Sequence, residues 1–318
     1  MRPIGGEIES NSIEENIYFT DSGRSSLRLF FKSGFSDKKV LLPNYFCEVI
    51  EDVLKSENIN YEFYNITEDL RVDVNSIENK QFDILYLINY FGIIQNIESL
   101  NLSEKIIIED NVFSFDFKNN GNYKQWYGFN SFRKISSLSD GSLIKTNLSI
   151  DATLIVNKEA DFVKTKDEAK HLKYQFIFDK LGDEQTYLTK FKKAENLLDE
   201  QNSIYSISNK SLYKLTNINQ QVEQEVLKKR YQILSKFFDS YSLKLEQKEY
   251  SFFILKLEKR DELRKLLINK NIFLPIHWPQ SSQENNLYSK LISIPLFSNY
   301  SDKEFKYMIG SIKEFLND

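Results

Sequence analysis

Apolar and polar positions along the first part of this chain follow two periods, and these periods predict its elements. Short apolar runs that stop at Pro, Gly or Asp are typical of strands buried in a parallel sheet. Between the early runs, apolar residues recur at helical spacing, as in the helix that opens at Ser22 and ends at Gly34. Alternating strands and helices indicate an α/β fold with a mostly parallel central sheet flanked by helices. The predicted strands are 39–43, 60–66, 82–91, 106–110, 126–132 and 141–146.

The pattern changes in the second half of the chain. Residues 161–198 are charged and helical in spacing, and 217–238 form a long amphipathic helix. Further on, Ser301 to Glu304 is a capping box that opens a final helix. We therefore expect two domains, a large α/β domain at 1–216 and a smaller C-terminal α+β domain at 217–318. The small domain contains predicted strands at 240–245, 250–257 and 291–295 and a helix at 261–271.

Composition narrows the class of protein. The chain has 318 residues, of which 41% are hydrophobic and 28% charged, so it can bury a large core. The net charge is −4 and the basic residues are scattered, which argues against a nucleic-acid partner. One cysteine, Cys47, and two histidines, His171 and His277, leave little material for disulfides or for a metal centre. No signal-peptide pattern or membrane-length apolar segment is evident, so we expect no membrane partner and a cytoplasmic location.

Two segments carry candidate chemistry. The buried strand predicted at 106–110 ends in Glu109 and Asp110, and ligands of open α/β sheets bind at that end of the strands. Lys134 follows Ser131 in a Ser-x-x-Lys unit. A strand-end Asp with a downstream Lys suggests pyridoxal phosphate (PLP), with a Schiff base to the Lys and the Asp beside the protonated pyridine nitrogen. The alternative interpretation is that Asp110 only ends a strand and that Lys134 is an ordinary surface lysine. No Gly-x-Gly-x-x-Gly or Walker loop follows any strand, which argues against dinucleotide or NTP binding.

Taken in order, these segments resemble the fold-type I PLP enzymes. They are most similar to the nucleotide-sugar aminotransferases of the DegT/StrS family, in a short-chain branch, and the resemblance spans nearly the full chain. It rests on Ile4-Gly5-Gly6-Glu7, Ser22-Gly23-Arg24-Ser25-Ser26-Leu27, Leu42-Pro43-Asn44-Tyr45-Phe46-Cys47, Asn89-Tyr90-Phe91-Gly92, Glu109-Asp110, Ser131-Phe132-Arg133-Lys134, Asp140-Gly141 and His277-Trp278-Pro279.

The resemblance implies a role for each matching residue. Lys134 would hold PLP and later move the proton, and Asp110 would keep the ring nitrogen protonated. The cofactor site would also contain an aromatic side chain stacked on the ring, either Tyr45 or Phe46. The phosphate would be held by Gly23, Arg24, Ser25 and Ser131. The substrate would meet Arg133, Asn89, Tyr90 and His277.

Two features of the chain depart from the family pattern. Phe113 stands where many members carry Gln or His near the cofactor's phenolic oxygen. The Asn-x-Arg unit that many members lend across a dimer is not evident, and 204–208 is the best match to that region. The first hypothesis remains an aminotransferase that moves an amino group from a glutamate-type donor to a nucleotide-linked keto sugar. It would act in surface polysaccharide or lipopolysaccharide synthesis, as a homodimer with shared active sites. A catalytically altered binding or regulatory protein of the same fold is the alternative that Phe113 favours, and an unrelated α/β protein is the third.

Overall fold

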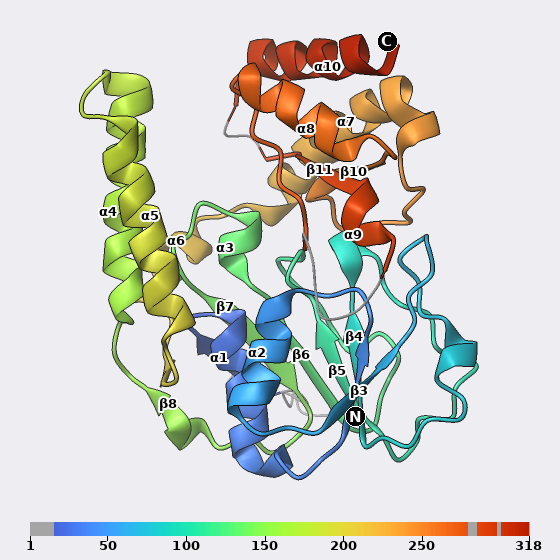
Figure 1. Cartoon of the computed structure of the whole chain (residues 1–318). Coiled ribbons are helices and arrows are strands. Elements are labelled where there is room, and N and C mark those ends of the chain that lie inside the picture. Colours follow the sequence, from blue (N-terminus) through green and yellow to red (C-terminus); the bar gives the residue numbers. More distant parts are fainter. Residues whose placement is uncertain (1–15, 279–284, 298–299, 318) are drawn as a thin grey trace, which may run out of the picture.

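The computed structural model describes residues 16–278, 285–297 and 300–317, and its centre is a seven-stranded sheet (Figure 1). The strand order is β1-β7-β6-β5-β4-β2-β3. In the described chain, β7 alone in this sheet runs antiparallel to its neighbours. The predicted α/β fold with a mostly parallel sheet is therefore confirmed. The strands are β1 (Asn16–Thr20), β2 (Val40–Pro43), β3 (Tyr61–Tyr64), β4 (Ile84–Ile88), β5 (Ile106–Asp110), β6 (Trp126–Phe129) and β7 (Ser142–Thr146).

Strand β5 lies in the middle of this sheet and is buried along its whole length. It pairs in parallel with β4 on one side and β6 on the other. Ile107 and Ile108 are fully buried, and each such side chain stabilises the fold by about 2 kcal/mol. The run of β-branched residues that predicted this strand thus fixes the position of Asp110 at its end.

Short helices connect the strands, and the first of them begins at a capping serine. Helix α1 (Gly23–Phe30) starts after Ser22, whose hydroxyl accepts the Ser25 N–H at 3.2 Å. A π-helical turn extends it to Phe35, and Gly34 ends it with a φ of +102°. The other helices of this part are α2 (Glu48–Ser56), α3 (Phe132–Ile135) and α6 (Asn209–Thr216).

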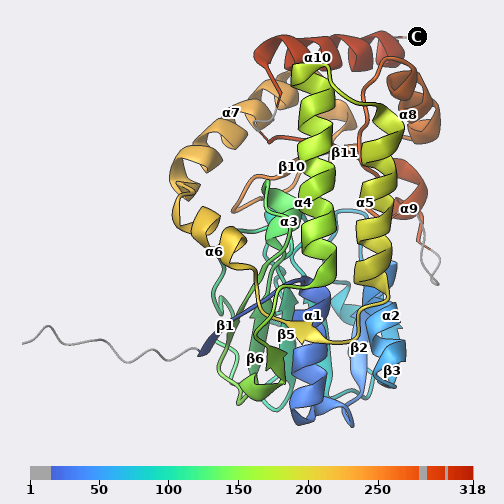
Figure 2. The same cartoon turned by 90° about the vertical axis from the view of Figure 1, so that its left-hand side faces the viewer.

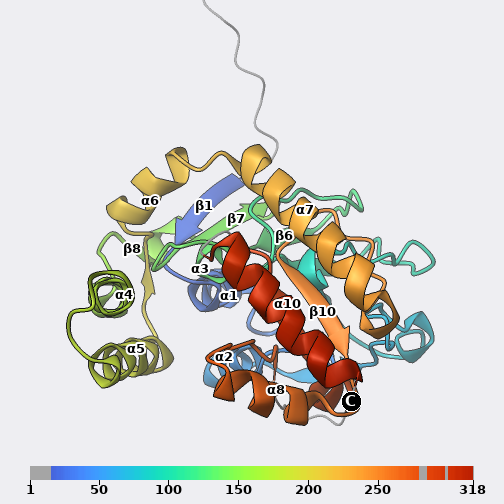
Figure 3. The same cartoon turned by 90° about the horizontal axis from the view of Figure 1, so that it is seen from above.

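The charged helical segment forms a hairpin of two helices, α4 (Asp161–Tyr174) and α5 (Glu184–Asp199). Its two helices run side by side (Figure 2), and the hairpin lies apart from the C-terminal helices (Figures 1 and 3). Its two ends meet where β8 (Ile155–Val156) pairs with β9 (Ile204–Tyr205). Near this base it has a small apolar cluster of its own, formed by Ala160, Phe162, Val163 and Leu198.

The C-terminal part builds a second, two-stranded sheet from β10 and β11. Helices α7, α8 and α10 lie around this sheet (Figure 3). Most of its apolar residues form a separate cluster, whereas Trp278, Leu287 and Tyr288 belong to the core of the central sheet. The domain boundary at 217 stays a prediction. The elements are α7 (Gln220–Phe238), β10 (Phe252–Lys256), α8 (Arg260–Asn269), α9 (Leu287–Lys290), β11 (Leu291–Pro295) and α10 (Asp302–Asn317).

Two strand predictions need correction. The strand predicted at 240–245 is wrong, because Asp239–Tyr241 is a 3₁₀ turn and only a single bridge joins Ser242 to Leu255. The strand predicted at 126–132 ends at Phe129, since the chain turns at Ser131 into α3. Strand β1 was not predicted, because its five residues are short of apolar alternation and it lies at the sheet edge.

Gly92 makes a contact that no other residue type can make. Its φ is +86°, and an added Cβ would lie 2.2 Å from the carbonyl oxygen of Glu249. We expect Gly92→Ala to lower the free energy of unfolding by about 3 kcal/mol, through positive-φ strain and backbone overlap. Gly310, in α10, has open space around its Cα, so Gly310→Ala should raise stability by about 1 kcal/mol. Urea unfolding of both variants checks this, and equal stabilities for the two would contradict it.

Candidate active site

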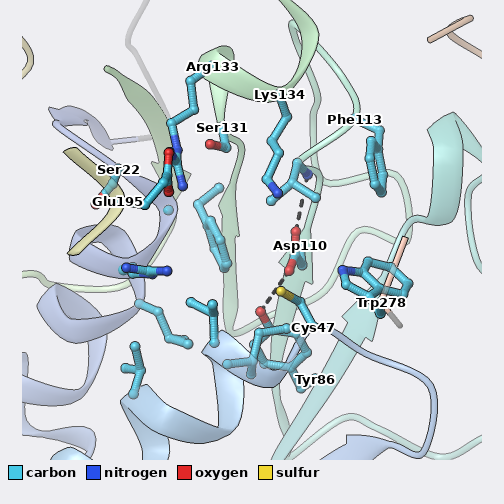
Figure 4. Close-up of a pocket in the computed structure, with 18 residues that line it drawn as sticks. Ser22, Cys47, Tyr86, Asp110, Phe113, Ser131, Arg133, Lys134, Glu195 and Trp278 are labelled. Atoms are coloured by element: carbon cyan, nitrogen blue, oxygen red, sulfur yellow. Dashed lines mark hydrogen bonds and ion pairs between the residues drawn. The ribbon is translucent and has the colours of Figure 1, made fainter. Parts of the chain in front are cut away.

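A cavity of about 300 Å³ lies where β4, β5 and β6 meet helices α1, α2 and α3 (Figure 4). Ligands of open α/β sheets bind at this kind of position. The cavity is lined by Ser22, Gly23, Arg24, Leu27, Cys47, Val49, Ile50, Val53, Tyr86, Asp110, Val112, Phe113, Phe129, Ser131, Arg133, Lys134, Glu195 and Trp278. It therefore brings together seven of the residues that the sequence predicted for the site, namely Gly23, Arg24, Asp110, Phe113, Ser131, Arg133 and Lys134.

Asp110 is the last residue of β5, and its carboxylate is held in place by two donors. The Tyr86 hydroxyl donates to Oδ2 at 2.9 Å, and the Val112 N–H donates to Oδ1 at 3.1 Å (Figure 4). Burial raises the pKa of Asp110 to about 6, against the lowering effect of these hydrogen bonds. A carboxylate in this environment gains from a cationic partner, because a positive charge offsets its desolvation.

Lys134 extends from α3 toward Asp110 (Figure 4). The short helix α3 starts at Ser131, and its first residue is anchored by the Phe132 N–H, which donates to the Gly141 carbonyl at 3.0 Å. Lys134 is exposed to the cavity, yet the surrounding walls desolvate its ammonium and lower its pKa. The positive charge of Arg133 acts in the same direction. A lysine with a lowered pKa is a better nucleophile and proton carrier near neutral pH.

The start of α1 forms another wall of the cavity. Ser22, Gly23 and Arg24 face it, and Ser131 lies across from them. The first N–H groups of a helix have no partner within the helix, so this end attracts an anion. Ser25 was predicted for the same role, but it is fully buried outside the lining, where its hydroxyl accepts from Ser22 at 3.2 Å. The start of α1 and Ser131 therefore both offer hydrogen-bond donors to an anion in the cavity.

The hairpin holds the loop that follows Lys134. Lys170 of α4 donates to the carbonyls of Ser137 and Leu138 at 2.8 and 2.7 Å. Asp167, one helical turn earlier, accepts the Ser139 hydroxyl at 2.5 Å. These contacts fix the backbone just beyond the lysine. Sequence reasoning did not detect this function of the charged segment, because nothing local identifies which of its charges point inward.

Acidic residues of α5 pair with cations near the cavity, and one of them, Glu195, itself lines it. Glu195 accepts from Arg133 Nη1 at 3.1 Å, and Lys166 of α4 donates to the same carboxylate. Asp199, one turn further, pairs with Arg24 Nη1 at 2.5 Å. Burial alone would raise the pKa of Glu195, but Arg133 and Lys166 lower it to about 2. The cations on this side of the cavity are therefore paired within the chain.

The two aromatic residues predicted to stack on the cofactor lie elsewhere. Tyr45 and Phe46 are both fully buried, and neither lines the cavity. The Tyr45 hydroxyl donates to the His277 carbonyl at 2.9 Å, and Phe46 packs on Phe63. The chain turns after Pro43 so that both rings join the core and Cys47 faces the cavity instead.

Three predicted substrate residues also lie behind the cavity wall. The Asn89 amide donates to Asn111 at 2.7 Å, and the Tyr90 hydroxyl donates to the Tyr45 carbonyl. Nδ1 of His277 lies 2.7 Å from the Ser293 hydroxyl, and burial lowers the pKa of this imidazole to about 3. None of the three lines the cavity.

Other residues of the lining were missed as site residues. Trp278 belonged to a matching motif but had no predicted role, and Tyr86 lies within an unremarkable apolar strand. Cys47 was noted for its rarity, not for its position. Phe113 packs against Phe91, with ring centroids 4.7 Å apart, so its ring continues the aromatic wall.

Some sequence predictions fall outside the described residues, namely Ile4-Gly5-Gly6-Glu7 and Pro279. The segment 204–208, the best match to the missing Asn-x-Arg unit, is largely occupied within its own chain. There the Ser208 hydroxyl donates to Asp140 at 2.8 Å. Over the ranges that the structure covers, no cluster of His, Cys, Asp and Glu is arranged to hold a metal ion. Over the same ranges, no helix combines the length and the apolar character needed to cross a bilayer.

Comparisons with known proteins support the fold. No family model matches the chain, and neither does any curated protein. Solved structures do match.

A DegT/DnrJ/EryC1/StrS aminotransferase from Brucella abortus has a TM-score of 0.61 and 15% identity, over 95% of this chain and 86% of that one. The aminotransferase TlmJ from Streptoalloteichus hindustanus has a TM-score of 0.64 and 12% identity, over 95% and 86%. The PLP form of the putative sugar aminotransferase Spr1654 from Streptococcus pneumoniae has a TM-score of 0.60 and 14% identity, over 94% and 86%. The chain has the fold of these aminotransferases.

Proposed function

We propose that this protein is a PLP-dependent aminotransferase that moves an amino group from a glutamate-type donor to a keto group of a nucleotide-linked sugar. The observation that carries the proposal is one cavity in which Lys134, Asp110 and the start of α1 face one another. An amine, a carboxylate and an anion site are the three groups that PLP requires. The shared fold with sugar aminotransferases supports the same function.

The residues of the cavity fit the cofactor. The N–H groups of Gly23 and Arg24, with the hydroxyls of Ser22 and Ser131, would hold its phosphate. Asp110 would lie beside the ring nitrogen, where its buried carboxylate would gain the cationic partner it needs. Trp278 and Phe113, which face the cavity, would form its aromatic wall in place of Tyr45 or Phe46. When bound, PLP withdraws electrons from the substrate carbon next to the transferred nitrogen.

The chain's own residues would orient the groups and move the proton. Lys134 would attach the cofactor and then, released, carry a proton at Nζ to and from the substrate carbon. Its lowered pKa favours the neutral amine that this step needs. Tyr86 would hold the Asp110 carboxylate in position through its 2.9 Å hydrogen bond. The α4 contacts at 137–139 would keep the lysine loop in register with the ring.

The finer assignments are part of the same proposal. Structures of this fold include a putative sugar aminotransferase, and on that basis we propose a nucleotide-sugar acceptor and a place in surface polysaccharide or lipopolysaccharide synthesis. A reducing compartment such as the cytoplasm suits the free thiol of Cys47 in the cavity wall. A binding or regulatory protein that has lost catalysis is less favoured, because Lys134 and Asp110 are both present and face each other.

We also propose a homodimer with active sites at the subunit boundary. The hairpin carries large apolar side chains on its surface, with Tyr174 55% exposed, Phe178 63% and Leu181 58%. Exposed apolar clusters of this kind mark interaction sites, and a second copy would cover both hairpins at once. Light scattering at micromolar concentration measures this directly, and a monomer with full turnover would contradict it.

Cys47 provides a direct test of cofactor binding. It is the only cysteine in the sequence, and it faces the cavity, so an alkylating reagent reports on this space alone. PLP should slow the alkylation of Cys47 by about tenfold or more and give a visible absorption band, while pyridoxal without phosphate protects far less. Alkylation at an unchanged rate, with no absorption band, would reject the cofactor.

Turnover tests the reaction itself. The PLP-loaded protein should convert glutamate to 2-oxoglutarate in the presence of one of a panel of UDP-, dTDP- and GDP-linked keto sugars. A cofactor-loaded protein that shows no conversion with glutamate, alone or with any acceptor, would favour the binding-protein alternative.

A further inference from the structure

The cavity ends, on the hairpin side, in a cluster of charges that the proposed reaction has not yet used. Arg133 from α3 and Lys166 from α4 both pair with Glu195 from α5. The two cations are largely buried, with side chains 13% and 12% exposed, whereas the Glu195 side chain is 43% exposed. Two buried cations thus share one carboxylate that retains access to solvent.

The position of this cluster relates it to the chemistry. Arg133 is the residue before Lys134, and both side chains line the same cavity. The two charges are close enough that Arg133 contributes to the lowered pKa of Lys134. In an α-amino acid the carboxylate is one carbon away from the amine. A donor whose amine takes the place of the released Lys134 amine would therefore bring its carboxylate into the neighbourhood of Arg133.

We infer that Arg133 and Lys166 form a subsite for a carboxylate group of the amino donor, and that Glu195 occupies this subsite when no donor is bound. The inference rests on the proposed aminotransferase function. The group now bound there is itself a carboxylate, with Oε1 and Oε2 at 3.1 and 3.3 Å from Arg133 Nη1. The N–H groups at the start of α1 are the other group of this cavity that attracts an anion.

Glu195 leaves the subsite in exchange for the donor carboxylate, since losing both cations without a replacement would be costly. The cations hold its pKa near 2, so at neutral pH it leaves as a charged group and not as a neutral acid. Its partial exposure means that rotation about the side-chain bonds takes the carboxylate into water rather than into the core. The donor carboxylate then replaces it against the same two cations, and charge balance at Arg133 and Lys166 is kept.

The inference predicts that replacing Glu195 and replacing either cation change the affinity for a carboxylate ligand in opposite directions. Removing the internal competitor with Glu195→Gln should tighten the binding of a carboxylate ligand by about three- to tenfold. Removing either cation, with Arg133→Gln or Lys166→Gln, should weaken it by about tenfold or more. Glu168→Gln is the matched control, because Glu168 pairs with Lys190 at 2.6 Å in the same hairpin but lies outside the cavity lining.

The test uses a ligand that cannot react. Glutarate is titrated into the full-length protein, with and without PLP, by isothermal calorimetry, so that the result needs no turnover. Tighter binding in Glu195→Gln, weaker binding in Lys166→Gln and an unchanged control support the subsite. Equal affinities in all the variants overturn it. Since glutarate binding is read separately from activity, inactivity with every keto sugar would count against the proposed function and not against the subsite.

Pyrophosphate provides the second arm. If it binds more tightly than glutarate and responds to the same three substitutions in the same order, the cluster is a phosphate subsite and the carboxylate assignment is overturned. If pyrophosphate binding is insensitive to Lys166→Gln while glutarate binding is not, the carboxylate assignment stands. A loss of affinity in Arg133→Gln counts only if Lys166→Gln shows it too. The short helix α3, which carries Arg133, is more easily disturbed by a substitution than α4.

Discussion

Replacing Lys134 with Ala abolishes covalent attachment of PLP and lowers turnover by about 10³-fold or more, since one side chain serves as both nucleophile and proton carrier. Within the described chain, Lys134 Nζ makes no hydrogen bond or ion pair, so its loss leaves the fold intact. The melting temperature should stay within about 2 °C. Borohydride treatment followed by peptide mass analysis measures the attachment, and turnover with glutamate measures the rate.

Lys145→Ala is the control for this experiment. Lys145 also lies near the central sheet, on β7, but it pairs with Asp116 at 2.6 Å and does not line the cavity. This variant should bind PLP and turn over as the wild type does. If Lys134→Ala still fixes the cofactor on the peptide that contains residue 134, or keeps normal turnover, the nucleophile is another residue.

Asp110→Asn should separate catalysis from stability. A neutral amide cannot keep the ring nitrogen protonated, so turnover should fall by about 100- to 1,000-fold, as when one preorganised electrostatic contact is lost. PLP should still bind, because the phosphate site and Lys134 are unchanged. Single-turnover kinetics with glutamate measure the effect, and an unchanged rate constant would exclude this role for Asp110.

The same substitution should stabilise the protein without cofactor. The pKa of Asp110 is raised from 3.8 to about 6, so the folded state disfavours the charged form. Below pH 3.8 the carboxyl is neutral in both states and there is no penalty. As pH rises from about 4 to 6 the penalty grows, and above pH 6 it reaches up to about 3 kcal/mol. Asp110→Asn removes it, so the apoprotein should gain stability at pH 7 and gain almost none at pH 4. Urea unfolding at the two values checks the sign.

Lys134 and Asp110 could be proposed from sequence as a pair because each lies in a local pattern. Three isoleucines run into Asp110 at a strand end, and Ser131 precedes Lys134 at a short fixed spacing. Both patterns involve only a few neighbouring residues, and the parallel sheet brings the two segments together through the β5–β6 pairing. Local pattern and sheet topology together therefore place the two predicted residues at one cavity.

The remaining site residues depend on contacts between distant segments. Glu195 is one of several acids on α5, and only the packing of the hairpin against α3 selects it. Tyr45, Phe46 and Cys47 are consecutive, and the tertiary structure alone decides which of them faces the cavity. The same limit explains the false strand at 240–245, where a turn and a single bridge leave no ladder to extend.

The shape of the hairpin has a consequence for how this protein tolerates change. All of its residues that touch the site, Lys166, Asp167, Lys170, Glu195 and Asp199, lie in the half near its base. The turn at the far end, around the αL residue Lys180 and Gly182, makes none of these contacts. An insertion at this turn would leave the cavity of its own subunit undisturbed, but it would fall within the apolar surface of Tyr174, Phe178 and Leu181 that the proposed dimer covers. A tag placed there would therefore change subunit association before it changed the cavity.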